Sequence, residues 1–550
     1  MRSLKINNTQ VDIDELTAIG IDLQSYDVKE PGKTFIKVSN TFTIPKTVNN
    51  LSIFGLASDV QSTSTAIYSR SSVDYWIENE QLVKDARCRV DEIGERISLF
   101  IFDKADVFDE LKLMSWGQFA GLMLLWLYNE KGLYAPNVLG TPYTGTMQGF
   151  VDEFGVAAGS KGIILPAAWG NLRSQRLQTI AASVERYVSG GSGLYSMYLY
   201  NRSEDPSGSG NYIESYGGHF GIFVKTVFEF IEEYFEVDFG VSKVGLDGNI
   251  WDDAVAQALF VDWKYLKVEV SGSSPNYSIY FGAQSDTSKF LPYTDIKDKE
   301  DKTVFDFVNA FFQIMNVIMD KIEVNGAEVF RLARFDGIET LAGVKDFSGK
   351  LSGIPVFKPI VEGYGQKNYI KFKTVFEGGE PLTNAKLLES SNLNTDANID
   401  LFEIDAHVCG IDAGTPDSLL DLSKPEAFKE FTFLAVDGVT TVDCYVVWFK
   451  TGVITAANAT KNLPLARLYD LDSEYNFLES IIEYPKFYEA KMWLTIEDIR
   501  DLQFFRQYFI KELNGSFFIN KIKGFNPDKS NEPTTLELIR ISDKTPDTLS

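Results

Sequence analysis

The chain has 550 residues, of which 44% are hydrophobic and 13% aromatic, a composition typical of several folded domains and not of a disordered protein. The 52 Lys and Arg residues against 77 Asp and Glu residues give a net charge of −25. This negative charge argues against tight binding of nucleic acid or of an anionic membrane surface. The three cysteines have no CxxC spacing, so the sequence contains neither a disulfide framework nor a zinc-knuckle pattern.

Two segments bear on where the protein is located. Residues 1–8 lack the apolar region of a signal peptide, which predicts a protein that is not secreted by the ordinary route. The longest apolar stretch, 119–128, is about half as long as a membrane span requires. We therefore predict no membrane span and interpret this stretch as a core helix, with a partner-binding helix as the alternative.

The first 105 residues predict an N-terminal β domain. Apolar and polar residues alternate in short runs separated by polar turns, which is typical of an antiparallel sheet with one solvent-exposed face. The following residues, 106–210, predict a mixed α/β domain, because the apolar helix is followed there by several Gly and Pro interruptions. Within the β domain we predict strands at 4–6, 11–13, 34–45, 73–77, 82–90 and 97–102.

One helical segment occurs twice, at residues 225–235 and 302–312. In each copy a threonine is followed three residues later by an acidic residue. This spacing predicts a capped helix start, because the hydroxyl accepts a bond from a free backbone N–H and the acid lies at the positive end of the helix dipole. The apolar residues follow helical spacing, so both helices are predicted to be buried, as parts of two related domains or as a chance similarity. The two pairs are Thr226 with Glu229 and Thr303 with Asp306.

The second copy runs into a predicted hairpin. Asn325 and Gly326 stand between two β-rich arms, and both residue types tolerate the positive φ of a two-residue turn. Near the end of the chain, Thr495 and Asp498 repeat the capping spacing and predict a short helix between strands.

These patterns together predict an α+β, β-rich fold with several domains of antiparallel sheet or barrel type and a few packed amphipathic helices. The predicted domains are an N-terminal β domain at 1–105, a mixed α/β domain at 106–210, a repeat-helix and hairpin domain at 211–345, a β-rich domain at 346–480 and a closing α+β unit at 481–550.

Catalytic and metal-binding patterns are scarce in the sequence. It has only two histidines and no P-loop, Rossmann fingerprint or GxSxG elbow. Alternation predicts Asp405, His407 and Cys409 on one face of a strand, where they would form a nucleophilic or metal-ligand set. Residues on one strand face lie ~6.6 Å apart, which favours the alternative of a half-buried strand with outward polar residues. Residues 470–474 resemble the start of a calcium loop but lack its glycine and its final glutamate. We therefore predict no catalytic, cofactor-binding or metal-binding residue.

Three stretches form an ordered pattern along the chain. The first, 33–55, has a strand that ends in Ile-Pro and then a polar turn with paired Asn before Phe-Gly. The second, 302–372, has the helix, the hairpin and the sequence Asp-Phe-Ser-Gly-Lys-Leu before a strand. The third, 494–541, has Leu-Thr-Ile-Glu-Asp-Ile, Leu-Asn-Gly and two apolar strands. In this order the stretches resemble the tail-tip or baseplate hub proteins of tailed phages, especially those of Bacteroidetes-type hosts.

The resemblance implies a structural virion protein that is not an enzyme, needs no cofactor, and is made in the host cytoplasm before it joins the virion. It implies a homo-oligomer around the tail axis, a trimer in preference to a hexamer, in contact with other phage tail proteins. DNA would pass such a hub without specific binding. Hubs of this kind contain barrel-like domains, some of them duplicated, although only a helix is repeated here.

Three alternatives stay open. The chain is also compatible with a distal-tail or adaptor ring, with a receptor-binding or glycan-binding virion component, and, ranked lowest, with a tail-associated hydrolase. The acid excess has two interpretations as well. Carboxylates lining a channel would keep DNA from adhering, whereas the same charge would also maintain solubility before assembly.

Overall fold

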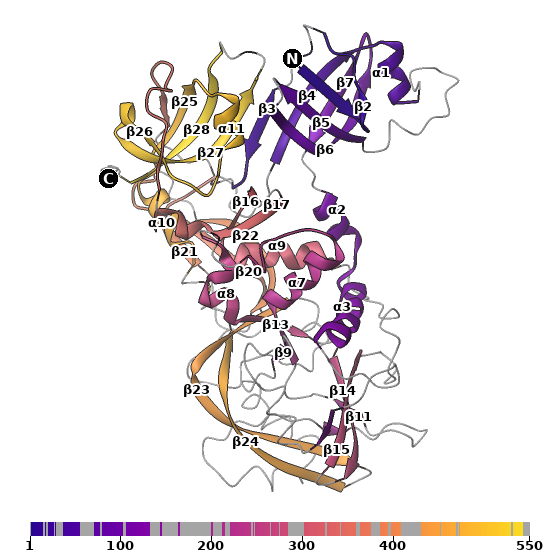
Figure 1. The fold of residues 1–550 in the computed structure, drawn as a ribbon. Helices are drawn as coiled ribbons and strands as arrows, with labels where there is room; N and C mark the ends of the chain where they lie inside the picture. Colours follow the sequence, from indigo (N-terminus) through magenta and orange to yellow (C-terminus); the bar gives the residue numbers. More distant parts are fainter. Residues whose placement is uncertain are drawn as a thin grey trace.

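The computed structural model describes residues 2–55, 71–131, 220–283, 302–408 and 431–542, with gaps inside these ranges, and the short segments 143–145, 163–164, 200–201 and 212–214. Mostly antiparallel sheets make up the fold, and a few helices pack with them, which confirms the predicted β-rich α+β class. In Figure 1 the N-terminal and C-terminal sheets lie side by side at the top, the helices lie in the middle, and a long two-stranded ribbon extends toward the bottom.

The N-terminal residues form an antiparallel meander in the order β4-β7-β6-β5-β1-β2. Asn7 and Asn8 have positive φ values of 49° and 61°, so the chain turns between β1 and β2 in two residues, a shorter turn than the four residues predicted between 6 and 11. The strands are β1 (Arg2–Ile6), β2 (Thr9–Gln10), β3 (Ile21–Gln24), β4 (Lys37–Pro45), β5 (Ser71–Ile77), β6 (Glu80–Ile93) and β7 (Arg96–Phe102).

The C-terminal strands continue the N-terminal sheet. Strand β27 pairs with β3, with Ile522 opposite Leu23, so that one 13-stranded sheet runs from β19 at one end to β2 at the other. The first and last predicted domains therefore share a sheet, while the domain limits themselves stay predictions. The strands added here are β18 (Lys345–Asp346), β19 (Val356–Lys358), β25 (Phe487–Met492), β26 (Tyr508–Ile510), β27 (Gly515–Phe525) and β28 (Thr534–Ser542).

The C-terminal unit contains the helix that its capping pattern predicted. Helix α11 (Ile496–Arg500) begins after Thr495, whose hydroxyl accepts a bond from the Asp498 N–H, while the Asp498 carboxylate accepts one from the Thr495 N–H. Helix α10 (Asn476–Glu483) is an addition to the predicted elements, because its N-cap residue provides no side-chain bond that a sequence pattern could reveal. Helix α1 (Val48–Ile53) replaces a predicted polar turn.

An aromatic core holds the helices of the middle part together. The Phe228 ring lies 5.1 Å from the Phe311 ring and 5.0 Å from the Trp251 ring, so the two repeated helices pack against each other. Phe119 and Met123 of the apolar stretch are fully buried, which confirms a core helix. The helical elements are α2 (Asp106–Leu113), α3 (Trp116–Lys131), α7 (Val224–Tyr234), α8 (Ala254–Ala258), α9 (Val304–Ile314), and the short turns η3 (Ile250–Asp252), η5 (Phe335–Thr340) and η9 (Lys511–Leu513). Among the described helices, none is long and apolar enough to cross a membrane.

The two repeated helices begin differently. In α9 the predicted cap is present, because Thr303 accepts a bond from the Asp306 N–H and the Asp306 carboxylate accepts one from the Thr303 N–H. In α7 the predicted cap is wrong. The chain passes directly from strand β12 (Phe220–Phe223) into the helix at Val224, so Thr226 lies inside the first turn and is buried.

We expect the two threonines to differ in their contribution to stability. Replacing Thr303 with Ala removes a capping hydroxyl and is expected to lower the free energy of unfolding by about 1 kcal/mol. Replacing Thr226 with Ala removes no cap and places a better helix former within the helix, so a smaller loss is expected. Thermal unfolding of both variants measures the difference, and equal losses would contradict the assignment of the caps.

The remaining strands form a hairpin and two further sheets. The predicted hairpin is confirmed by the pairing of β16 with β17 up to Val324 and Ala327, although its Asn-Gly turn lies outside the described residues. An eight-stranded sheet includes parallel pairing of β22 with β20 and with β23, a departure from the predicted antiparallel arrangement. Strands β23 and β24 also pair with each other as the long ribbon in Figure 1. The strands are β8 (Tyr143–Gly145), β9 (Ile163–Ile164), β10 (Tyr200–Asn201), β11 (Tyr212–Glu214), β12 (Phe220–Phe223), β13 (Leu259–Trp263), β14 (Leu266–Ser273), β15 (Asn276–Ala283), β16 (Val317–Val324), β17 (Ala327–Arg334), β20 (Lys367–Val375), β21 (Lys386–Glu389), β22 (Asn398–Val408), β23 (Phe431–Lys450) and β24 (Val453–Leu468).

Candidate functional site

The candidate nucleophilic or metal-ligand set of Asp405, His407 and Cys409 lies only partly within the described residues. Asp405 is in β22, where its carboxylate forms an ion pair with Lys302, the residue just before the Thr303 cap. The backbone of His407 pairs with Thr374 and Thr432, and Cys409 lies outside the described residues. The Asp405 carboxylate therefore holds β22 to the start of α9, and the absence of a catalytic or metal-binding role for the three residues stays a prediction.

The calcium-like segment ends in a buried ion pair. Glu474 is almost fully buried and pairs with Arg334, which also reaches Asp253 at 3.0 Å. Asp253 in turn accepts bonds from the first backbone N–H groups of α8. These carboxylates are occupied by structural contacts. Within the described residues, no group of three or more His, Cys, Asp or Glu side chains is placed to hold a metal ion.

A buried polar junction ties distant segments together. Asn316 is fully buried and has a positive φ of 47°, and its amide oxygen accepts a bond from the Tyr26 hydroxyl at 3.0 Å. Its amide nitrogen donates to Asp336 at 3.2 Å. Burial raises the pKa of Asp336, and backbone N–H bonds from Phe477 and Asn476 oppose that rise. These satisfied bonds indicate a structural role for the junction.

Charged side chains line one face of the C-terminal strands, which is called the outer face here. Residues that lie opposite each other in neighbouring strands share one face, so a cross-strand ladder of charges forms there. Lys358 lies 2.9 Å from Glu489, and Lys523 lies 2.6 Å from Glu537 and 3.8 Å from Glu489. Hydrogen bonding from Lys358 lowers the pKa of Glu489 below its ordinary value.

Large apolar side chains flank this ladder. Lys491 follows Glu489 at the two-residue spacing that places both on one face of β25, and Trp493, directly after the end of this strand, is 42% exposed. At the edge of the sheet Ile354 is 96% exposed and Val356, opposite Glu489, is 57% exposed. We define the outer face as Ile354, Val356, Lys358, Glu489, Lys491, Trp493, Lys521, Lys523 and Glu537.

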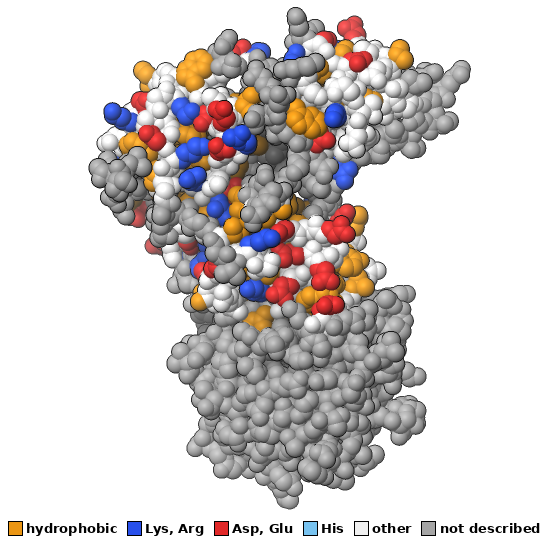
Figure 2. All heavy atoms as spheres, viewed as in Figure 1, with side chains coloured by type: hydrophobic (Ala, Val, Ile, Leu, Met, Phe, Trp, Pro, Cys, Tyr) orange, Lys and Arg blue, Asp and Glu red, His pale blue; other side chains and the backbone are white. Residues whose placement is uncertain are grey.

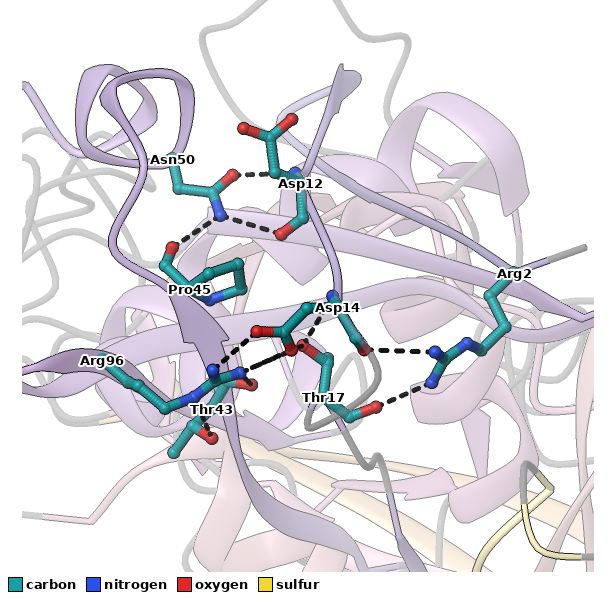
Figure 3. A network of polar contacts seen from close by, with 8 residues as sticks. All are labelled: Arg2, Asp12, Asp14, Thr17, Thr43, Pro45, Asn50 and Arg96. Carbon is teal, nitrogen blue, oxygen red and sulfur yellow. Dashed lines mark hydrogen bonds and ion pairs between the residues drawn. The ribbon is translucent and has the colours of Figure 1, made fainter.

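The two ends of the 13-stranded sheet differ in how their edges are closed. Beyond β2, the Asn50 amide oxygen accepts the Asp12 N–H at 2.8 Å while its nitrogen donates to the Asp12 carbonyl at 2.9 Å, as a neighbouring strand would (Figure 3). The Asn49 side-chain nitrogen also donates a hydrogen bond to the Gln10 carbonyl, at 3.0 Å. At the other end, β19 pairs with β25 and ends the sheet in the part of the chain that the structure describes. The outer face therefore adjoins the open edge.

The segment that follows β2 is fixed by two arginines. Arg96 binds Asp14 with two nitrogens at 2.7 and 2.9 Å, which holds the pKa of Asp14 well below its usual range. Arg2 donates to the backbone carbonyls of Asp14 and Thr17 (Figure 3). The closed edge of the sheet is thus also rigidly held.

A half-buried carboxylate in the middle part responds to pH. Glu232, near the end of α7, accepts the Phe239 N–H at 2.7 Å and the Val241 N–H at 3.0 Å. Burial raises its pKa to about 7, from an ordinary value of 4.5. The folded protein therefore binds this proton more tightly than the unfolded chain, and the free energy of unfolding falls as the pH rises from 4.5 to 7.

We expect Glu232→Gln to remove this contribution while its amide oxygen keeps both backbone bonds. Between pH 5 and pH 8 the wild type should lose about 1 to 2 kcal/mol more than the variant, because solvent screens a carboxylate that is only partly buried. Denaturation at several pH values measures the difference. Parallel pH profiles for the two proteins would show that Glu232 titrates normally.

Figure 2 shows how charge is distributed over one side of the molecule. Lys and Arg side chains gather over the C-terminal sheet at the upper left, whereas Asp and Glu side chains gather over the helices in the middle. No sequence pattern pointed to the outer face. The two-residue spacing of Glu489, Lys491 and Trp493 was the available signal, but only the strand pairing adds Val356 and Lys358 to it.

No protein-family model and no curated protein matches the chain. Among solved structures, the crystal structure of the prophage MuSo2 43 kDa tail protein from Shewanella oneidensis aligns with 98% of this chain and 98% of its own, at 7% sequence identity and a TM-score of 0.30. A similarity at this level shows neither the fold nor the function of this chain.

Proposed function

We propose that this chain is a structural protein of a phage tail, a tail-tip or baseplate hub that assembles with further copies around the tail axis. The ordered resemblance of the three sequence stretches supports the phage assignment. The observation that carries the assembly role is the outer face, where Ile354 and Trp493 are exposed beside a charged ladder at the open edge of a sheet. A sheet edge with exposed apolar side chains is a common place for another polypeptide to bind.

We also propose that the chain has the five domains predicted from its sequence, contacts other tail proteins and lets DNA pass without specific binding. The net charge of −25 supports the last point, because a strongly acidic protein repels the phosphate backbone. A trimer is preferred to a hexamer on the resemblance alone.

Two measurements test the proposal. Native mass spectrometry of the full chain over a range of concentrations is expected to show a closed oligomer. Antibody against the chain is expected to label the end of the tail in electron micrographs of the virus. A strict monomer at high concentration, or label on the capsid alone, would count against a hub.

A receptor-binding or glycan-binding virion component is the second candidate. Trp493 and Tyr484 are exposed in the described C-terminal unit, and exposed aromatic rings stack on sugars. Binding of the full chain to a glycan array, lost in Trp493→Ala and kept in a variant of an exposed residue elsewhere, would favour this role.

A further inference from the structure

A second surface has the opposite charge to the outer face. Glu130 of α3 and Glu233 of α7 are exposed, as is Glu236 just beyond the end of α7, and Tyr234 at the end of α7 is 44% exposed. The Trp126 indole N–H donates to the Glu233 carboxylate at 2.8 Å, so the two helices present one continuous surface. Glu130 lies one turn beyond Trp126 on the same side of α3. We define the acidic face as Trp126, Glu130, Glu233, Tyr234 and Glu236.

The two faces complement each other in charge and in composition. The outer face carries four lysines against two glutamates, whereas the charged side chains of the acidic face are all carboxylates. Each face also has exposed aromatic surface, from Trp493 on one and Tyr234 on the other. Complementary potentials of this kind steer association and fix its register, and aromatic side chains supply most of the contact energy.

The two edges of the sheet cannot themselves provide a head-to-tail contact between copies. Asn49 and Asn50 close the β2 edge, so a second copy cannot extend the open β19 edge with its own opposite edge. A contact between unlike surfaces is head-to-tail, and it generates a ring when its rotation closes.

We infer that the outer face of one copy is covered by the acidic face of a second copy of this chain. This inference rests on the proposed function and names the partner of the surface on which that proposal depends. In this contact Lys491 lies opposite the carboxylates of the acidic face, and Trp493 packs against Tyr234. Ile354 becomes buried at the margin of the contact.

Charge reversal on the full chain tests the contact. Sedimentation velocity is expected to show that Lys491→Glu weakens self-association about tenfold, and that Glu130→Lys/Glu236→Lys does the same. Combining all three substitutions should restore association, because the charges are exchanged rather than removed. Added salt should weaken association of the wild type. Lys46→Glu, an exposed reversal in the N-terminal sheet, is the matched control and should have no effect.

The outcomes separate this inference from the proposed function. If the oligomer forms but neither reversal weakens it, or the combined variant is not restored, the two faces do not meet and the inference is wrong while the hub proposal stands. If the wild type stays monomeric at every concentration, both are contradicted. Ile354→Ser provides a check without a change of charge, since substituting a residue that is 96% exposed in the single chain affects folding little and should still weaken the contact.

Discussion

Replacing Arg331 with Met is expected to lower the free energy of unfolding by about 3 to 5 kcal/mol, because it leaves a buried carboxylate without its partner. Arg331 binds Asp320 at 2.7 Å in the β16–β17 hairpin, and their side chains are only 6% and 3% exposed. Burial already raises the pKa of Asp320, with Arg331 opposing that rise. The loss should be smaller at low pH, where protonation removes the uncompensated charge.

The double variant Asp320→Asn/Arg331→Met is the control for this prediction. It removes both charges together, so most of the lost stability should return. Calorimetry of the wild type, the single variant and the double variant provides the comparison. A single variant that loses no more than the double variant would show that the charge pair is not what stabilises the hairpin.

Substituting Gly248 with Ala is the second change with a large expected effect. Gly248 has a φ of +71°, and a β-carbon placed there would lie 2.1 Å from Cε1 of Phe505, a ring that is itself buried. The Phe505 ring also lies 5.3 Å from the Arg331 guanidinium, so it links the C-terminal unit to the hairpin. We expect a loss of about 2 to 4 kcal/mol, from overpacking added to the unfavourable backbone conformation.

Gly349→Ala separates these two causes. Gly349 has a similar φ of +79°, but nothing lies within 4 Å of the position of its β-carbon. Its substitution should therefore cost only the conformational part, about 1 kcal/mol. Thermal unfolding of the Gly248 and Gly349 variants measures the two losses of stability. Similar losses in both would mean that the Phe505 ring moves aside and that the joint is not tightly packed.

Local patterns predicted elements wherever a few neighbouring residues determine them. Thr495 with Asp498 and Thr303 with Asp306 start helices as predicted, because a capping box is satisfied entirely within four residues. The same pattern at Thr226 failed, because the preceding strand β12 passes directly into the helix and extends it by a turn. A pattern of side chains does not reveal where an adjoining strand ends.

The candidate site depends on pairings that the sequence does not contain. Glu489 and Lys491 alternate within β25 and Trp493 follows its end, so a common face could be predicted from the two-residue spacing. Val356 joins them only because β19 pairs with β25, which lies more than a hundred residues further along the chain. Register between distant strands is determined by packing of the whole sheet, and so the site became visible only in the structure.

The pairing of β3 with β27 bears on when the protein becomes competent to associate. The Gly524 N–H donates to the Asp22 carboxylate, a contact between residues 502 positions apart in the sequence. During translation the N-terminal strands emerge long before their partner, so this part of the sheet closes only after β27 has been synthesised. The strands that carry most of the outer face are made in the same late interval. Nascent chains would thus lack the surface for joining other copies, which delays association until synthesis is nearly finished.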